Sequence, residues 1–197
     1  MQGKFIVFEG IDKSGKHTQS RMLFEYLRKK GNRVIYTDEP TSDNPAGLLI
    51  KDWLAGKFEL KSGEAITLLY TADRFEHLKR TILPALEKGM TVISDRYFYS
   101  TIAYESAIFG VPQEWIRKLH EKVRKPDVVI FIDIEPEISL QRRRTRPDDR
   151  LEKAELLNKV RDAYRAMAKS EGFFVLNGNR AKEEVFADVK KIVDRLF

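Results

Sequence analysis

The chain has 197 residues and contains no cysteine. This absence excludes disulfide bonds, thiolate metal sites and cysteine nucleophiles together. The sequence also lacks any apolar stretch near the roughly 20 residues that cross a bilayer, so we expect no membrane partner. A strand pattern begins directly after residues 1–4, without a secretory signal before it. We therefore expect a cytoplasmic protein.

Linkers, internal repeats and low-complexity segments are also missing from the sequence. With 42% hydrophobic residues, the chain is long enough to bury a full core. We therefore predict a single domain over residues 1–197.

The formal net charge of +6 fits either a nucleic acid or a small anion as the partner. Lysine and arginine are dispersed over the predicted helices, apart from one cluster at 142–146. No alternation of basic and aromatic residues suggests a stacking surface for single strands. A local cluster fits a phosphate site better, so we expect no nucleic-acid partner.

Strand and helix patterns alternate along the chain. Apolar runs predict strands at 5–8, 34–37, 91–94, 128–132 and 173–176. Helical spacing extends from about Gly15 to Lys30, from Pro45 onward, over 64–76, and from about Lys182 to Leu196. The alternation predicts an α/β fold with about five parallel strands and helices on both faces of the sheet.

A phosphate-binding loop follows the first predicted strand. Gly10, Gly15 and Lys16 fit the spacing G-x-x-x-x-G-K-[ST] up to its last position, and a helix pattern follows. Glycines let the backbone N–H groups surround a phosphate, and the helix adds its positive end. We predict that this loop binds ATP through Gly10, Ile11, Asp12, Lys13, Ser14, Gly15, Lys16, His17 and Thr18.

The last position of this motif holds His17, and the first hydroxyl, that of Thr18, comes one residue late. Imidazole is a poor ligand for Mg²⁺, which prefers oxygen. An acid at a strand end, such as Asp95, can hold the ion through water. The candidate ligands for Mg²⁺ bound with ATP are therefore His17, Thr18 and Asp95.

A second phosphate site is predicted where the strand at 91–94 ends. Asp95 and Arg96 emerge together there, and a guanidinium can bind a phosphate through two hydrogen bonds. An ordinary capping ion pair is the alternative. The pair Glu39-Pro40 follows the strand at 34–37 and reaches the same edge of the sheet.

The basic cluster at 142–146 is followed by turn residues at 147–150. A loop of arginines that closes over the phosphates would stabilise the charge of a phosphoryl transfer. A solvated helix end is the alternative. We predict a short arginine-rich lid at about 142–152.

An ordered set of motifs resembles the thymidylate kinase family over nearly the whole chain. The set comprises residues 10–19, Glu39-Pro40, residues 68–74, Asp95-Arg96-Tyr97 with Ser100 and Ala103-Tyr104, and residues 143–152. Taken one at a time, the motifs other than the phosphate loop are not specific. The whole set, in this order and at these spacings, is specific for the family. The resemblance implies a three-layer P-loop NTPase fold, transfer of the γ-phosphoryl group of MgATP to dTMP, and a homodimer.

The resemblance also implies residue roles. Asp12 looks like the acid that contacts the deoxyribose 3′-hydroxyl, and Lys13 stands where one branch of the family has an arginine aimed at the transferred phosphoryl group. Tyr70 matches an aromatic residue that stacks on thymine, Arg74 a residue that hydrogen-bonds the base, and Arg96 a residue that binds the acceptor phosphate.

Tyr104 would close the pocket, whereas Arg143 and Arg150 belong to the lid and to the ATP site. Without the resemblance, Tyr70 and Tyr104 could equally be aromatic residues that pack in the hydrophobic core. The implied catalytic residues are Asp12, Lys13, Lys16, Arg96 and Arg143. The implied substrate-binding residues are Asp12, Glu39, Pro40, Tyr70, Arg74, Arg96, Tyr97, Ser100, Tyr104 and Glu105.

Four positions depart from the family pattern. His17 replaces Ser or Thr, Asp38 stands where arginine is common, Glu105 replaces a frequent Gln next to the base, and Leu151 replaces an aromatic residue of the lid. Two alternatives therefore stay open. One is a kinase for another pyrimidine monophosphate (dUMP, UMP or dCMP), and the other is a nucleotide-binding ATPase without transfer activity.

Overall fold

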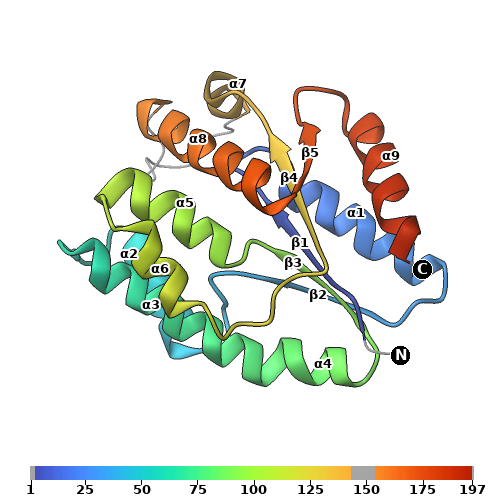
Figure 1. Cartoon of the computed structure of the whole chain (residues 1–197), viewed down its shortest axis with the longest axis horizontal. Helices are drawn as coiled ribbons and strands as arrows, with labels where there is room; N and C mark the ends of the chain where they lie inside the picture. The colour runs from blue at the N-terminus through green and yellow to red at the C-terminus, as the bar shows by residue number, and fades with distance from the viewer. Residues whose placement is uncertain (1–2, 143–153, 197) are drawn as a thin grey trace.

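A computed structural model, which describes residues 3–142 and 154–196, has a five-stranded parallel sheet at its centre (Figure 1). The strands lie in the order β2-β3-β1-β4-β5, and each neighbouring pair is parallel. This confirms the predicted α/β fold. The bounds of the strands are β1 Phe5–Glu9, β2 Val34–Asp38, β3 Thr91–Asp95, β4 Val128–Asp133 and β5 Phe174–Asn177.

Helices connect the strands. The described helices are α1 Lys16–Lys29, α2 Pro45–Leu54, α3 Gly63–His77, the π-helical turn η1 Leu78–Ile82, α4 Leu83–Glu87, α5 Phe98–Phe109, α6 Gln113–Leu119, α7 Pro136–Gln141, α8 Ala154–Glu171, α9 Lys182–Val193 and the 3₁₀ turn η2 Asp194–Leu196. The closing helix, predicted to Leu196, is α-helical only to Val193, because its last turn tightens to 3₁₀ geometry. Among the described residues, no helix is long and apolar enough to cross a membrane.

The sheet is covered on both faces, which gives three layers. Alternate side chains of β1 point to opposite faces, so Phe5 and Val7 join one core cluster while Ile6 and Phe8 join the other. The first cluster includes side chains of α3, α4, α5 and α8, and the second includes side chains of α1 and α9. Because β1 is buried on both faces, its sequence is a continuous apolar run rather than an alternating one.

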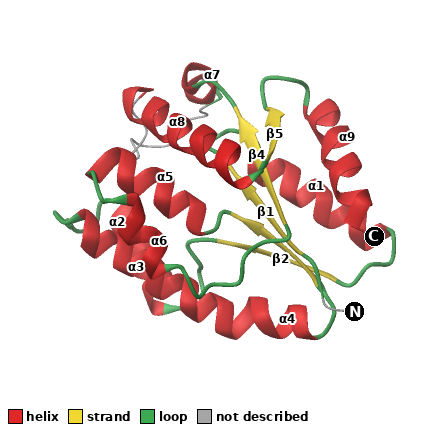
Figure 2. Cartoon of the chain, in the orientation of Figure 1, coloured by secondary structure: helices red, strands yellow, loops and turns green. Residues whose placement is uncertain are grey.

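The order of the strands fixes where a ligand can bind. The strand β1 lies between β3 and β4. The chain places β2 and β3 on one side of β1 and then crosses to place β4 and β5 on the other side. Open α/β sheets bind ligands outside the carboxyl ends of the strands at such a switch point. The predicted segments 10–18, 39–40 and 96–97 follow β1, β2 and β3 at this edge, in the loops drawn beyond the arrowheads in Figure 2.

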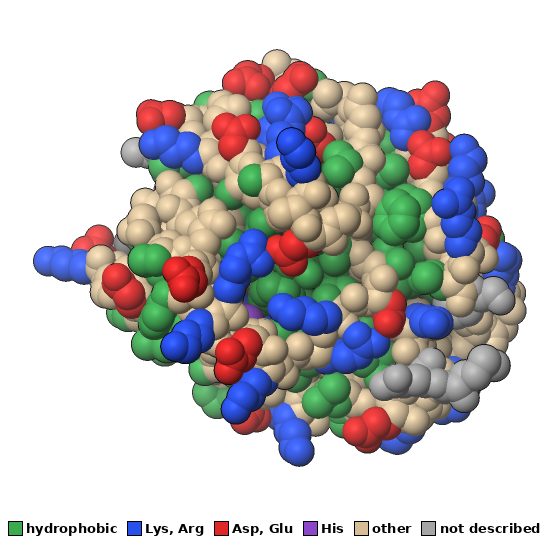
Figure 3. Space-filling view, viewed as in Figure 1, with side chains coloured by type: hydrophobic (Ala, Val, Ile, Leu, Met, Phe, Trp, Pro, Cys, Tyr) green, Lys and Arg blue, Asp and Glu red, His purple; other side chains and the backbone are tan. Residues whose placement is uncertain are grey.

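On the face drawn in Figure 3, lysine and arginine side chains are interspersed with aspartate and glutamate. This face has no continuous basic stripe of the kind that follows a nucleic-acid backbone.

Candidate active site

The loop between β1 and α1 has the backbone geometry of a phosphate cradle. Gly15, directly before α1, has a φ of 102°, and Gly10 has a φ of 150°. A side chain at Gly10 would meet the carbonyl oxygen of Ile132 at 2.7 Å, so only glycine fits there. The first N–H groups of α1, which begins at Lys16, have no partner within the helix and are free to bind an anion.

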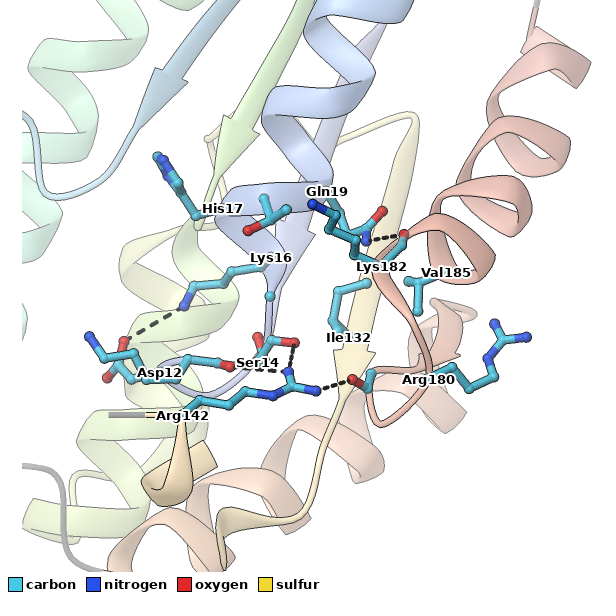
Figure 4. A pocket seen from close by; sticks show the side chains of 14 residues that line it. Asp12, Ser14, Lys16, His17, Gln19, Ile132, Arg142, Arg180, Lys182 and Val185 are labelled. Carbon is cyan, nitrogen blue, oxygen red and sulfur yellow. Dashed lines mark hydrogen bonds and ion pairs between the residues drawn. The ribbon is translucent and has the colours of Figure 1, made fainter. Parts of the chain in front are cut away.

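Lys16 and Asp12 lie close together at the end of this loop (Figure 4). The Lys16 Nζ atom is 3.3 Å from the carbonyl oxygen of Ile11 and 3.6 Å from the Asp12 carboxylate. Burial, and then the charge of Arg96, lower the pKa of Lys16, while Asp12 opposes them. Burial by itself would raise the pKa of Asp12, but Arg96 and Lys16 hold that pKa well below its usual range. The carboxylate is therefore ionised between two cations.

A cavity of about 510 Å³ lies over this loop. Of the nine loop residues predicted to bind ATP, residues 12–18 line it, whereas Gly10 and Ile11 do not. The carbonyl oxygens of Gly10 and Ile11 instead accept hydrogen bonds from the side chains of Arg96 and Lys16, respectively. The predicted lid residues Arg143 and Arg150 lie outside the described residues, as does Leu151.

Half of the residues that line this cavity were not among those predicted to bind ATP, although one of them, Arg142, begins the predicted lid. Arg142 donates to the carbonyl groups of Ser14 and Gly178, at 3.3 and 2.8 Å, and the Gln19 amide donates to the Lys182 carbonyl at 2.9 Å (Figure 4). The other residues missed are Ile132, Arg180 and Val185. Residues 178–182 directly follow β5 at the same edge of the sheet, so the rule applied to β1, β2 and β3 would have found them.

A second cavity, of about 200 Å³, adjoins the first. All ten residues predicted to bind the acceptor substrate line it: Asp12, Glu39, Pro40, Tyr70, Arg74, Arg96, Tyr97, Ser100, Tyr104 and Glu105. Leu54 and Thr101 were missed. Tyr70 and Tyr104 therefore line a cavity as well as packing against the core.

Arg96 and Asp12 form the junction between the two cavities. One guanidinium nitrogen of Arg96 lies 2.6 Å from the Asp12 carboxylate, and the other donates to Ser100 at 2.9 Å. The Tyr104 hydroxyl lies between them, 3.2 Å from Arg96 and 3.1 Å from Asp12. Asp12 lines both cavities. A group bound in the second cavity against Arg96 would therefore face the phosphate loop.

The backbone of Arg96 is strained to reach this place. Its φ is 74°, a left-handed conformation that costs a residue other than glycine about 1 to 3 kcal/mol. Two hydrogen bonds hold it, from its own N–H to Phe8 at 2.9 Å and from the Ser94 hydroxyl to its carbonyl at 2.7 Å. Such strain persists where the surroundings over-determine it, and this is typical of functional sites.

Glu9 lies behind Arg96 and is completely buried. Its carboxyl accepts hydrogen bonds from the Tyr97 N–H, the Ser100 hydroxyl and the Tyr164 hydroxyl. Burial outweighs these bonds and the Arg96 charge, and it raises the pKa of Glu9 to about 7. Sequence reasoning missed this residue because it directly follows the apolar run at 5–8 and precedes the first glycine of the phosphate-loop motif, so it belongs to neither signal.

Arg74 is held inside the protein by a buried network at the other end of the second cavity. It donates to the Glu39 carboxylate from two nitrogens, at 2.9 and 2.7 Å, and to Thr101 at 3.1 Å. It also donates to His120 at 2.8 Å, and His120 in turn contacts the Ile116 carbonyl with its other ring nitrogen. Burial and the Arg74 charge lower the pKa of His120 to about 3, so its ring is a neutral acceptor.

The candidate metal residues lie beside Lys16. One Asp95 oxygen, Oδ2, lies 3.2 Å from the His17 ring, and the other, Oδ1, is buried without a hydrogen-bond partner among the described residues. Burial opposes ionisation of Asp95, but the His17 hydrogen bond and the Lys16 charge lower its pKa. Tyr36 also contacts the His17 ring, at 3.1 Å. The imidazole therefore engages a carboxylate, and Asp95 keeps one oxygen available.

Comparison with known proteins identifies the family to which this chain belongs. Residues 8–189 match the family model described as thymidylate kinase. A probable thymidylate kinase of Pyrobaculum aerophilum is 42% identical over 197 residues, which cover 98% of this chain and 97% of the relative. A thymidylate kinase of Caldicellulosiruptor saccharolyticus is 38% identical over 203 residues, which cover 100% and 98%.

Two solved structures are similar over almost the whole chain. Thymidylate kinase from Ehrlichia chaffeensis has a TM-score of 0.80 at 29% identity and covers 98% of this chain and 99% of its own. The enzyme from Candida albicans has a TM-score of 0.82 at 27% identity, with 98% and 92% covered. The fold and the site thus define a phosphotransferase of the P-loop class. Within that class, the chain belongs to the thymidylate kinase family.

Lys13 provides a test of strain in the phosphate loop, because its φ of 58° is left-handed. Lys13→Gly and Lys13→Ala both remove the charge, but only glycine relieves the backbone. We expect the glycine variant to be more stable than the alanine variant by about 1 kcal/mol. Urea unfolding measures this difference, provided that the free energy of unfolding falls with urea concentration at the same slope in both variants. Coincident midpoints would contradict it.

Proposed function

We propose that this protein transfers the γ-phosphoryl group of ATP to dTMP, which yields ADP and dTDP for dTTP synthesis. The observation that carries the proposal is the junction at Asp12, which lines both cavities and lies 2.6 Å from Arg96. The proposal includes one domain over residues 1–197 and a cytoplasmic location, where ATP and nucleoside monophosphates are available.

The donor occupies the cavity over the phosphate loop. The backbone N–H groups at the start of α1 and the Lys16 ammonium bind the β- and γ-phosphates. Lys13 and the lid residue Arg143 neutralise charge that develops on the transferred group, and Arg150 binds ATP from the lid. These charges act at the transition state, where electrostatic stabilisation contributes most.

The acceptor occupies the second cavity with its phosphate against Arg96 and its sugar against Asp12. An oxygen of the acceptor phosphate attacks the γ-phosphorus, and the bond from that phosphorus to the β-phosphate oxygen breaks. Because the acceptor itself is the nucleophile, no nucleophilic side chain is required. Tyr70 stacks on the base, and Arg74, fixed by Glu39, Thr101 and His120, presents its remaining donor to it.

Magnesium bound with ATP is part of this proposal. The Oδ1 atom of Asp95, which has no hydrogen-bond partner within residues 3–142 and 154–196, fits an oxygen ligand to the ion or to its water shell. The described residues contain no group of three or more acids, histidines or cysteines that could hold a metal. This agrees with Mg²⁺, which is usually bound by one or two carboxylates, waters and substrate phosphates. When bound, the ion neutralises phosphate charge.

A panel of monophosphates tests the proposed function. With ATP and Mg²⁺, we expect ADP release to depend on dTMP more than on dUMP, UMP or dCMP. Higher activity with UMP would favour a different pyrimidine kinase, and ATP hydrolysis without any phosphorylated acceptor would favour an ATPase.

The variant Lys16→Ala tests the proposed role of Lys16 in charge stabilisation, and it should lower kcat by about 10² or more. The control is Lys29→Ala, at the exposed end of the same helix.

His17 is predicted to weaken the metal site. His17→Thr supplies a hydroxyl ligand, so it should lower the Mg²⁺ concentration that gives half-maximal rate. His17→Ala separates two causes, because it frees Asp95 without adding an oxygen. If both variants shift the Mg²⁺ dependence equally, release of Asp95 is the cause. If neither variant shifts the Mg²⁺ dependence, water or Thr18 already completes the metal site, and His17 does not weaken it.

We also propose a homodimer formed through α2 and α3, which pack against each other. Exposed large apolar side chains gather on these helices: Leu48, Leu49, Leu68 and Phe75 are 42% to 50% exposed. Such side chains are typical of protein interfaces when they are contiguous.

Light scattering at the exit of a sizing column tests this face. We expect the wild-type protein to have twice the mass of one chain and Leu68→Lys to have the mass of a single chain. Val175→Lys is the control, because Val175 is 51% exposed on the edge strand β5. A dimer that survives Leu68→Lys but not Val175→Lys would move the interface to the sheet edge.

A further inference from the structure

One carboxyl group in the second cavity takes no part in the ion pairs described above. The Glu105 side chain on α5 lines the cavity with Tyr70 and Arg74, and the residue is only 1% exposed. Its Oε2 atom is buried and has no hydrogen-bond partner among the described residues. Buried polar atoms without partners are rare in folded proteins, so this one, which lines a cavity, is available to hydrogen-bond a ligand there.

Glu105 lies toward the end of the cavity that is farther from the phosphate loop. Arg96, at the near end, contacts Ser100 and Tyr104, whereas Arg74 contacts Thr101. Glu105 follows Thr101 by four residues, so the two side chains share one helix face. When the acceptor phosphate lies against Arg96, the base therefore lies toward Arg74 and Glu105. This step rests on the proposed function.

The charged groups of the cavity already neutralise each other. Asp12 pairs with Arg96 at 2.6 Å, and Glu39 pairs with Arg74 at 2.7 Å. Among the described residues that line the cavity, no cation is left for Glu105, and burial raises its pKa to about 8. The carboxyl group is therefore mostly protonated at neutral pH.

The titratable groups of the neighbouring elements leave Glu105 without an ionic partner. Burial, and then the charge of Glu105, raise the pKa of Tyr70 on α3, so this tyrosine stays neutral beside Glu105. Tyr97, which follows β3, donates to the Arg124 carbonyl. From the helices packed against α5, α8 contributes Tyr164, which donates to Glu9, and α6 is followed by His120, which binds Arg74. None of these groups forms a hydrogen bond or an ion pair with Glu105.

A neutral carboxyl group matches the edge of one class of base. It presents an O–H donor next to a C=O acceptor. Thymine and uracil present the complementary pair on the edge that carries N3: the imide N–H donates to the C=O of the acid, and the neighbouring carbonyl oxygen accepts from its O–H. An ionised carboxylate has only acceptors, so one of its oxygens would face a carbonyl oxygen without a proton between them.

We infer that Glu105 reads the imide edge of a pyrimidine monophosphate as a neutral carboxylic acid, donating from one oxygen and accepting on the other. Glu105 is thus a specificity residue for bases with an imide, such as thymine and uracil. The glutamine that is frequent in the family supplies a donor and an acceptor without titrating. The glutamate supplies the same pair only while it keeps its proton.

The test compares Kd and KM for dTMP at pH 7 and pH 9 in the wild-type protein and in Glu105→Gln. Because only the protonated form binds well, both constants should rise about tenfold in the wild type over this range. Glu105→Gln keeps both hydrogen-bonding groups, so its ratio should stay near one. Titrations of dTMP and of Glu9 are common to both proteins and cancel in the comparison.

A second ligand and a second variant test the same inference. The ligand dUMP, which has the imide but lacks the methyl group, should show the same tenfold ratio in the wild type. Glu105→Leu should raise Kd by about tenfold at pH 7 and make it independent of pH. A flat wild-type profile, or an equal rise in Glu105→Gln, would overturn the inference.

Calorimetric binding separates this inference from the proposed function. If dTMP binds with the expected pH dependence but no phosphoryl group is transferred, the proposed function fails and the inference stands. If transfer proceeds and Kd is independent of pH, the inference fails and the proposed function stands.

Discussion

The contact between Asp12 and Arg96 is the constraint on which the rest of the site depends. Two cations, Lys16 and Arg96, approach the same half-buried carboxylate from the two cavities. Without Asp12 these two cations would repel each other at the junction of the cavities. The carboxylate therefore lets one edge of the sheet hold two cations, as the proposed binding of two phosphorylated ligands requires.

The same principle organises the far end of the second cavity. Glu39 compensates the charge of Arg74, and His120, held neutral by burial, accepts a hydrogen bond from one of its remaining N–H groups. An arginine immobilised in this way presents its last donor in a fixed direction, so the cost of ordering it is met on folding rather than on binding. Rigid polar groups of this kind are what an enzyme needs to distinguish bases that differ by one hydrogen bond.

The strands and the phosphate loop could be predicted because their signals are local. A continuous apolar run at 5–8, followed by Gly10, Gly15 and Lys16, already contains the buried strand, the turn and the helix start. Partners could not be predicted, because Arg96 and Asp12 are 84 positions apart and Gln19 and Lys182 are 163 apart. The protonation of Glu105 was hidden for a different reason: it depends on burial by α3 and α5, and the sequence carries no direct record of burial.

His17 illustrates how a departure from a motif can be accommodated by its neighbours. Its ring contacts Asp95 and Tyr36, and Arg21 lies 3.8 Å from the Tyr36 ring centre. The hydrogen bond to Asp95 raises the pKa of His17 and so favours a positive charge beside the phosphate loop. The imidazole therefore holds the Asp95 carboxylate in place through Oδ2, and Oδ1 is left without a partner among the described residues. In the proposed function, a fixed carboxylate with one open oxygen would partly compensate for the missing hydroxyl ligand.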